Sequence, residues 1–113
     1  MIEEYQFGKI IVSGKAYTSD IIIFGDIVLD NWWRNKGHEL CISDIKDAVD
    51  EFNPKILIVG TGKLGIMKVL PETISFLEYR SIQLITQKTG KAWKTFNELT
   101  TSEKVMGAFH LTC

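Results

Sequence analysis

Three glycines with the spacing G-x-G-x-x-G, at Gly60, Gly62 and Gly65, follow the apolar residues 56–59. This spacing is typical of a strand that leads into a dinucleotide-binding turn. That function also needs a helix that begins inside the motif and an acidic residue about 20 positions later. Here the next helix is expected only at Pro71, and Thr86 stands where the acidic residue should be. The pattern therefore predicts a buried strand ending in a tight turn, and no dinucleotide cofactor is expected.

The same turn could bind a smaller anion. Successive backbone N–H groups in such turns can form an anion-binding nest, and Lys63 or Lys68 could add a positive charge. Glycine also reaches positive φ and allows close packing without any ligand. Two interpretations therefore stay open, a phosphate or carboxylate site and a purely structural turn.

Residues 30–38, with the sequence DNWWRNKGH, combine aromatic, basic and titratable side chains. Neighbouring side chains of an extended segment point to opposite sides, so Trp32 and Trp33 cannot both enter one core. One of them is expected at a surface, a cleft or an interface, and Trp and Arg often anchor protein contacts. Arg34 could bind a carboxylate or phosphate, and His38 could titrate near neutral pH. In the structural alternative, one Trp closes the core edge and Arg34 stacks on the other.

Each histidine precedes a cysteine by three positions, in the pairs His38/Cys41 and His110/Cys113. Two His and two Cys form an acceptable zinc ligand set, but the usual signature has paired Cys followed by paired His. No metal site is predicted from this order. Residues 110–112 are instead expected to finish an ordered last strand, with Cys113 packed against the body of the protein.

Length and composition indicate one globular domain that spans residues 1–113. The net charge of −1 comes from 13 basic and 14 acidic residues without long like-charge runs, so neither nucleic acid nor a membrane is an expected partner. No targeting segment or membrane span is visible. The two cysteines do not suggest a disulfide framework, which indicates a reducing compartment, the cytoplasm.

Hydrophobic periodicity predicts strands first and then alternating helices and strands. One helix is expected after an N-cap at Ser43, with its apolar face at i, i+3, i+4 and i+7, and it ends at Pro54. The expected strands are 7–12, 17–24, 27–29, 56–59, 82–85 and 105–111, and the further helices are 71–79 and 90–99. This order predicts a single layered α/β domain, in which a central mixed β-sheet has flanking helices and an extra N-terminal β-hairpin layer.

Several short motifs occur together in a fixed order: Phe7-Gly8, Trp33-Arg34…Gly37-His38, Val59-Gly60-Thr61-Gly62, Leu70-Pro71-Glu72, Thr89 with Lys94–Leu99, and His110–Cys113. Over essentially its whole length the chain resembles a small family that carries a domain of unknown function. The family groups archaeal and bacterial hypothetical proteins with a human adipogenesis-associated protein and a mitochondrial complex I assembly factor. The resemblance implies a compact α/β domain, no established catalytic residues, and an assembly or regulatory role rather than an enzymatic one. The positions that match its pattern are Trp33, Arg34, His38, Gly60, Gly62, Thr89, Asn97, His110 and Cys113.

The sequence therefore supports two functional hypotheses. The first is a non-catalytic protein-interaction, assembly or regulatory module that contacts a protein partner, or a second copy in a homodimer, through Trp32 and Trp33. The alternative is a protein or enzyme that binds a small anion, phosphate or carboxylate at the Gly60–Gly62 turn. The candidate ligand-binding residues are Trp33, Arg34, His38, Gly60, Thr61, Gly62 and Thr89, and no catalytic residue, metal or cofactor is assigned. The discriminating question is whether Arg34, His38 and the turn meet at one concave site.

Overall fold

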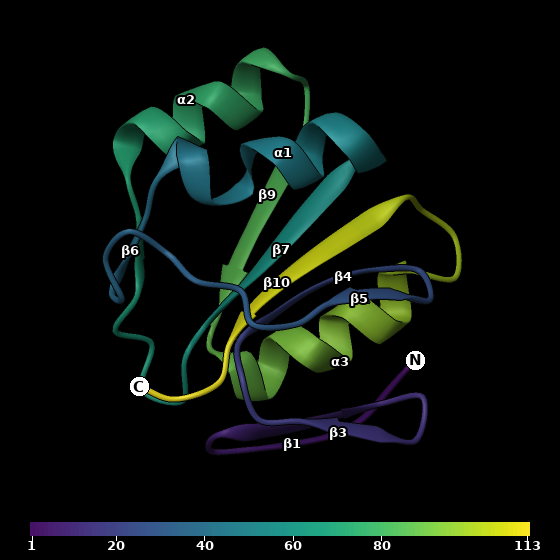
Figure 1. The fold of residues 1–113 in the computed structure, drawn as a ribbon. Helices are drawn as coiled ribbons and strands as arrows, with labels where there is room; N and C mark the ends of the chain where they lie inside the picture. The colour runs from purple at the N-terminus through teal and green to yellow at the C-terminus, as the bar shows by residue number, and fades with distance from the viewer.

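The computed structural model describes all of residues 1–113. Its centre is a five-stranded sheet in the order β5-β4-β10-β7-β9 (Figure 1). These strands are β4 (Ile21–Phe24), β5 (Ile27–Leu29), β7 (Ile56–Thr61), β9 (Gln83–Gln87) and β10 (Val105–His110). β10 is antiparallel to β4 and parallel to β7, which in turn is parallel to β9. The sheet is therefore mixed, as predicted.

Two smaller sheets surround this centre. β1 (Ile2–Gln6), β2 (Lys9–Val12) and β3 (Lys15–Tyr17) form an antiparallel sheet, which is the predicted N-terminal layer. β6 (Glu39–Leu40) and β8 (Lys68–Val69) form a short parallel pair. β1 was not among the expected strands, because its pairing is interrupted between Ile2 and Glu4 and its alternation is correspondingly irregular.

Three helices flank the central sheet: α1 (Ile42–Phe52), α2 (Pro71–Tyr79) and α3 (Thr89–Leu99). α1 and α2 lie together on one face, and α3 lies with the β1–β3 layer on the other (Figure 1). The expected N-cap at Ser43 is wrong: the N-cap is Cys41, whose N–H donates to the Asp44 carboxylate at 2.8 Å. The Asp44 side chain thus satisfies an N–H at the helix start that the helix itself cannot.

Two hydrophobic cores form because the side chains of the central strands alternate between the faces. On β7, Leu57 and Val59 join the core under α1 and α2, whereas Ile56 and Ile58 join the core under α3. β7 and β10 are buried along their whole length, which explains their uninterrupted apolar sequences. The site residues are therefore held at the end of a sheet covered on both faces.

None of the three helices has the length and apolar character needed to cross a membrane.

Candidate functional site

The turn after β7 packs directly against residues that follow β10. Gly62 has a φ of +103°, and a Cβ atom there would overlap the main chain of Cys113 and lie 2.9 Å from His110 Cδ2. At Gly60, a Cβ would lie 2.7 Å from the Phe109 ring. Glycine is therefore required at both positions for backbone conformation or close packing.

The N–H groups of this turn already have acceptors within the chain. Gly62 N–H donates to Thr89 Oγ1 at 2.9 Å, and that hydroxyl donates to the His110 carbonyl at 2.6 Å. Lys63 N–H donates to the Thr112 carbonyl at 2.6 Å, and Ile66 N–H donates to the Cys113 carbonyl at 3.2 Å. The N–H groups that could have formed an anion nest thus donate to Thr89 and to the protein's own C-terminal segment. An external ligand at Gly60, Thr61, Gly62 and Thr89 would have to displace that segment.

Arg34 lies in the interior rather than on an open anion-binding surface. Its side chain is only 5% exposed, and Nη1 donates to Asp20 Oδ2 at 2.8 Å. Nε and Nη2 donate to the Gly37 carbonyl, and the guanidinium lies 4.8 Å from the centre of the Trp32 ring. Of the structural alternative, the stacking of Arg34 on a tryptophan is found, but the ring is that of Trp32, the buried tryptophan, and not that of the exposed Trp33.

Asp20 joins Arg34 to the end of β10. Its Oδ2 lies 2.8 Å from His110 Nδ1, and its Oδ1 accepts the Leu111 N–H at 2.8 Å. Burial alone raises the pKa of Asp20, but the hydrogen bonds from His110, Leu111 and Arg34 outweigh it and hold the pKa below its usual value. Asp20 was not among the candidate site residues, and its one signal in the sequence is the position of a carboxylate directly before the apolar strand β4.

His110 is oriented by this carboxylate. Its Nδ1 also lies 3.0 Å from Arg34 Nη2. Because a guanidinium nitrogen only donates and Nη2 already has Gly37 as acceptor, we assign the Nδ1 proton to the bond with Asp20. Nε2 has no hydrogen-bond partner and belongs to a side chain that is almost fully buried. An Asp–His pair of this kind is the orienting half of a general base.

Arg34, His38 and the glycine turn meet at His110, but not at an open hollow. Arg34 contacts the His110 ring from one side and Gly62 from another, and the ring of the exposed His38 lies edge-on at 6.1 Å. None of the three hollows on the surface is lined by Arg34, His38 or His110. The cluster therefore ties β10, the turn and residues 30–38 together.

The two adjacent tryptophans have opposite environments, as predicted. Trp32 is 8% exposed, and its Nε1 donates to the Asp44 carbonyl at 2.9 Å. Trp33 is 82% exposed and lines two hollows, of about 240 and 260 Å³.

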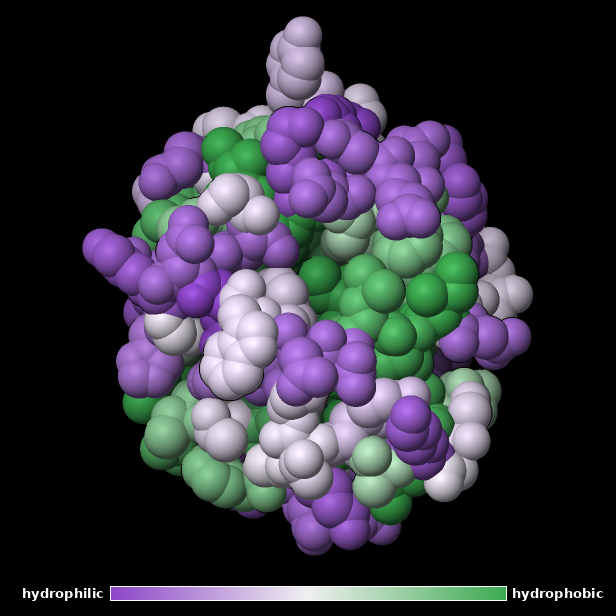
Figure 2. Space-filling model, in the orientation of Figure 1, coloured by the Kyte–Doolittle hydropathy of each residue, from purple (hydrophilic) through white to green (hydrophobic).

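The larger of these two hollows is acidic. We call its rim the Trp33 surface, formed by Leu29, Asp30, Trp33, Asp44 and Asp47. No basic residue lines it. Beside it, β5 is the edge strand of the central sheet and exposes Ile27 as well as Leu29. Figure 2 shows apolar side chains gathered over β5 with hydrophilic side chains around them.

Comparison with known proteins finds one matching family and several solved structures with a similar fold. A family described as "Protein of unknown function (DUF498/DUF598)" matches residues 2–110. A conserved hypothetical protein from Pyrococcus horikoshii OT3 is similar with 27% identity and a TM-score of 0.85, covering 100% of this chain and 99% of that one. An outer membrane protein from Bartonella henselae shares the fold at 22% identity with a TM-score of 0.83, covering 99% and 94% of the two chains. A Bordetella parapertussis protein shares it at 22% identity with a TM-score of 0.82, covering 96% and 92%.

Proposed function

This chain belongs to the DUF498/DUF598 family of proteins of unknown function, and we propose that it is a non-catalytic protein-binding module that uses the Trp33 surface. The observation that carries the proposal is a tryptophan 82% exposed to solvent beside an acidic hollow. Tryptophan is among the residues most enriched at the energetic centres of protein interfaces. The family membership confirms the resemblance expected from the sequence, and an assembly or regulatory role is compatible with such a module.

The position of Trp33 is fixed by its two neighbours. Trp32 is buried and hydrogen-bonded to α1, and Arg34 is buried and paired with Asp20. The backbone between two such anchors has little freedom, so Trp33 is held outward before any partner arrives. Binding through a pre-organised side chain loses less conformational entropy and is correspondingly tighter.

The charges around Trp33 define the chemistry of the partner. Asp44 already accepts the N–H groups of Asn35 and Cys41, whereas Asp30 and Asp47 are exposed and have no ion-pair partner. Two free carboxylates next to an indole ring favour a protein segment with Lys or Arg side chains beside an apolar residue. We therefore propose a basic, partly apolar segment of another protein as the occupant.

A displayed random-peptide library selected on the immobilised protein tests this function. Peptides that also bind a Trp33→Ala variant are removed, and the remaining peptides are synthesised for fluorescence-anisotropy titration. We expect these peptides to combine Lys or Arg with an apolar residue, and Trp33→Ala to weaken them by about 30-fold, as for an interface hot spot. Asp47→Asn should weaken binding less and reduce its dependence on salt.

Lys104→Gln is the matched control, because Lys104 is exposed, makes no ion pair and does not line the hollow beside Trp33. It should leave every Kd within two-fold, the effect of about 0.4 kcal/mol expected at an uninvolved surface site. The proposal fails if no peptide survives selection, or if the surviving peptides are acidic. A second copy of this chain is the rival occupant, and dimerisation abolished by Trp33→Ala in sedimentation experiments would overturn the choice of a different protein.

Both cysteines are free thiols, which supports the cytoplasm as the proposed location.

A further inference from the structure

The largest hollow of the molecule is basic, in contrast to the acidic hollow beside Trp33. It has a volume of about 470 Å³ and is lined by Tyr5, Lys63, Lys88, Gly90, Lys91, Trp93 and Lys94, which we call the lysine hollow. Lys63 follows the end of β7, and Lys88 directly follows β9, so the hollow lies at the carboxyl ends of two parallel strands. Open α/β sheets commonly bind small ligands at this edge. The volume falls within the usual range for small-molecule sites, about 300–1,000 Å³.

The positive charges of the lysine hollow are not neutralised by the protein. None of its four lysines takes part in an ion pair, and no acidic residue lines the hollow. Residues 52–71 and 79–97, which build this edge, contain no Asp or Glu at all. A protein of net charge −1 therefore presents a locally positive surface here, and a bound anion would relieve the repulsion among the lysines.

The start of α3 increases this positive character. The N-cap is Lys88, which makes no side-chain cap hydrogen bond, and the first turn has no acidic residue. A lysine at a helix N-terminus opposes the helix dipole, and the first N–H groups of a helix lack intrahelical acceptors. A Cβ atom at Gly90 would meet nothing within 4 Å, so the space beside this residue is open. This helix start lacks the capping side chain and the acidic first turn that stabilise most helices, and such departures are common at functional sites.

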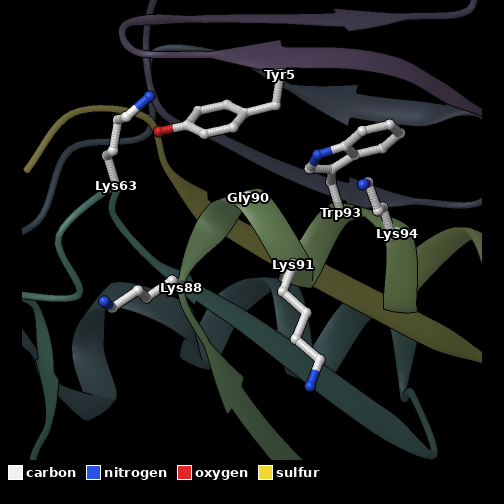
Figure 3. Close-up of a pocket in the computed structure, with 7 residues that line it drawn as sticks. All are labelled: Tyr5, Lys63, Lys88, Gly90, Lys91, Trp93 and Lys94. Atoms are coloured by element: carbon white, nitrogen blue, oxygen red, sulfur yellow. The ribbon is translucent and has the colours of Figure 1, made fainter.

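Two aromatic rings form the other wall of the lysine hollow. Tyr5 is held in place because its hydroxyl donates to the Leu111 carbonyl at 2.9 Å. Trp93 lies on α3, and the Lys94 ammonium lies 5.6 Å from its ring centre. Figure 3 shows both rings on the same side of Gly90, with the end of Lys63 near the Tyr5 hydroxyl and the Lys88 and Lys91 side chains extending away on the other side. An apolar wall and a cationic wall thus meet at the start of α3.

We infer that the lysine hollow binds a small organic phosphate whose flat ring lies against Tyr5 and Trp93. The phosphate lies at Gly90, whose N–H donates to it; this N–H has no acceptor in the chain, whereas Thr89 N–H donates to the Gly62 carbonyl and Lys91 N–H to the Lys88 carbonyl. The flexible Lys63, Lys88 and Lys91 side chains close over the phosphate. This site is distinct from the Trp33 surface and from the Gly60–Gly62 turn. Of the lysines expected to assist an anion at that turn, Lys63 lines the hollow and Lys68 does not.

The hollow favours a small molecule over a nucleic acid. Nucleic-acid sites extend along basic stripes on proteins that are basic overall, whereas this chain carries 14 acidic residues against 13 basic ones. The seven acidic residues of positions 26–51 include those of the Trp33 surface and would repel a long polyanion.

Isothermal titration calorimetry and Trp fluorescence with defined probes test the inference: AMP, ADP, adenosine, inorganic phosphate, a single-stranded RNA oligonucleotide, and vesicles with and without an anionic phospholipid. We expect ADP to bind with a Kd below about 1 mM and AMP to bind more weakly. Adenosine lacks the phosphate that the cationic wall would contact, and inorganic phosphate lacks the ring that the aromatic wall would contact. Both should therefore bind at least about ten-fold more weakly than AMP. Lys88→Gln and Lys91→Gln should each weaken ADP binding by roughly five-fold. Added salt should weaken the binding of ADP to the wild type.

Lys104→Gln serves again as the control and should change the Kd for ADP by less than two-fold, within about 0.4 kcal/mol of wild type. The substituted residues Lys88, Lys91 and Lys104 are all exposed, so the variants should remain folded, which circular dichroism checks. The inference is overturned if no probe binds the folded wild type at 10 mM, or if Lys88→Gln/Lys91→Gln binds ADP as tightly as wild type. Equal affinity for ADP and inorganic phosphate would overturn the role of the rings. Lysine-dependent binding of RNA or of anionic vesicles, without binding of ADP, would overturn the small-molecule assignment.

Discussion

The substitution Asp20→Asn should destabilise the protein strongly, because Asp20 alone neutralises the buried Arg34. The carboxylate accepts hydrogen bonds from Arg34, His110 and the Leu111 N–H. Asparagine keeps one acceptor oxygen but loses the charge and turns an amide group toward one of these donors. The guanidinium remains almost fully buried, with the Gly37 carbonyl, the His110 ring and the Trp32 ring as its remaining contacts.

The size of the effect follows from these contacts. Hydrogen bonds to a charged group contribute about 1.5–3 kcal/mol each, so three of them set an upper bound near 9 kcal/mol. The retained oxygen and the retained partners of Arg34 reduce this loss. We expect a decrease in the free energy of unfolding of about 3–5 kcal/mol, the range for buried pairs that lose one partner. Urea unfolding followed by far-UV circular dichroism at pH 7 measures it.

The pH dependence gives a second readout that a packing defect would not produce. The folded-state pKa of Asp20 is lowered, so its contribution is complete above the unfolded-state pKa, about 3.9. The contribution is lost as the pH falls through the lower folded-state pKa. The stability difference between wild type and Asp20→Asn should therefore become smaller below about pH 4.

Asp26→Asn is the control, because Asp26 is an exposed carboxylate with no ion pair, and it should change stability by less than about 0.5 kcal/mol. A loss below about 1 kcal/mol for Asp20→Asn, typical of surface pairs, would refute the reasoning. So would a difference from wild type that is the same at pH 7 and pH 3.

Three further substitutions test other parts of the structure by the same unfolding measurement. Trp32→Ala should cost about 3–5 kcal/mol, whereas Trp33→Ala should stay within about 0.5 kcal/mol, and equal losses would contradict their opposite burial. Gly62→Ala should cost at least about 1–3 kcal/mol, because its φ of +103° strains any other residue and its Cβ overlaps Cys113; a neutral result would mean that the C-terminal segment does not pack there. Thr89→Val should cost about 2–4 kcal/mol, because it leaves the Gly62 N–H and the His110 carbonyl without their shared partner; an unchanged midpoint would show that this hydroxyl bridge contributes nothing.

Local patterns were sufficient to predict much of the fold. Three local patterns mark elements that form where they were expected. They are the apolar residues 56–59, the helical spacing i, i+3, i+4 and i+7 of apolar residues in 45–52, and Pro71 at a helix start. These patterns work because each reflects a single element packed against a continuous core. The prediction that residues 105–111 form a strand is confirmed for Val105–His110.

The candidate site could not be predicted in the same way, because its contacts join distant parts of the chain. Asp20, Arg34 and His110 meet only because β10 lies beside β4 in the sheet. The sequence left Arg34 either as a ligand-binding residue or as a side chain stacked on a tryptophan, and no local pattern shows that Asp20 would neutralise it. Charges that are dispersed along the sequence also separate in space, into an acidic Trp33 surface and a basic lysine hollow. The ligand-binding roles assigned to the seven candidate residues stay predictions.

The position of β10 in the middle of the sheet has a consequence for how the chain folds. β4 and β5 can pair locally as a hairpin, and β7 and β9 can pair around α2, but only β10 joins these two halves. Met106 must find Phe24 across most of the chain, and such non-local pairing slows folding to the millisecond-to-second range. Until residues 105–110 insert, the facing edges of β4 and β7 are open to pairing with other molecules. Folding intermediates, rather than the native protein, are thus the species most prone to aggregation, and a chain shortened before Val105 would remain in that state.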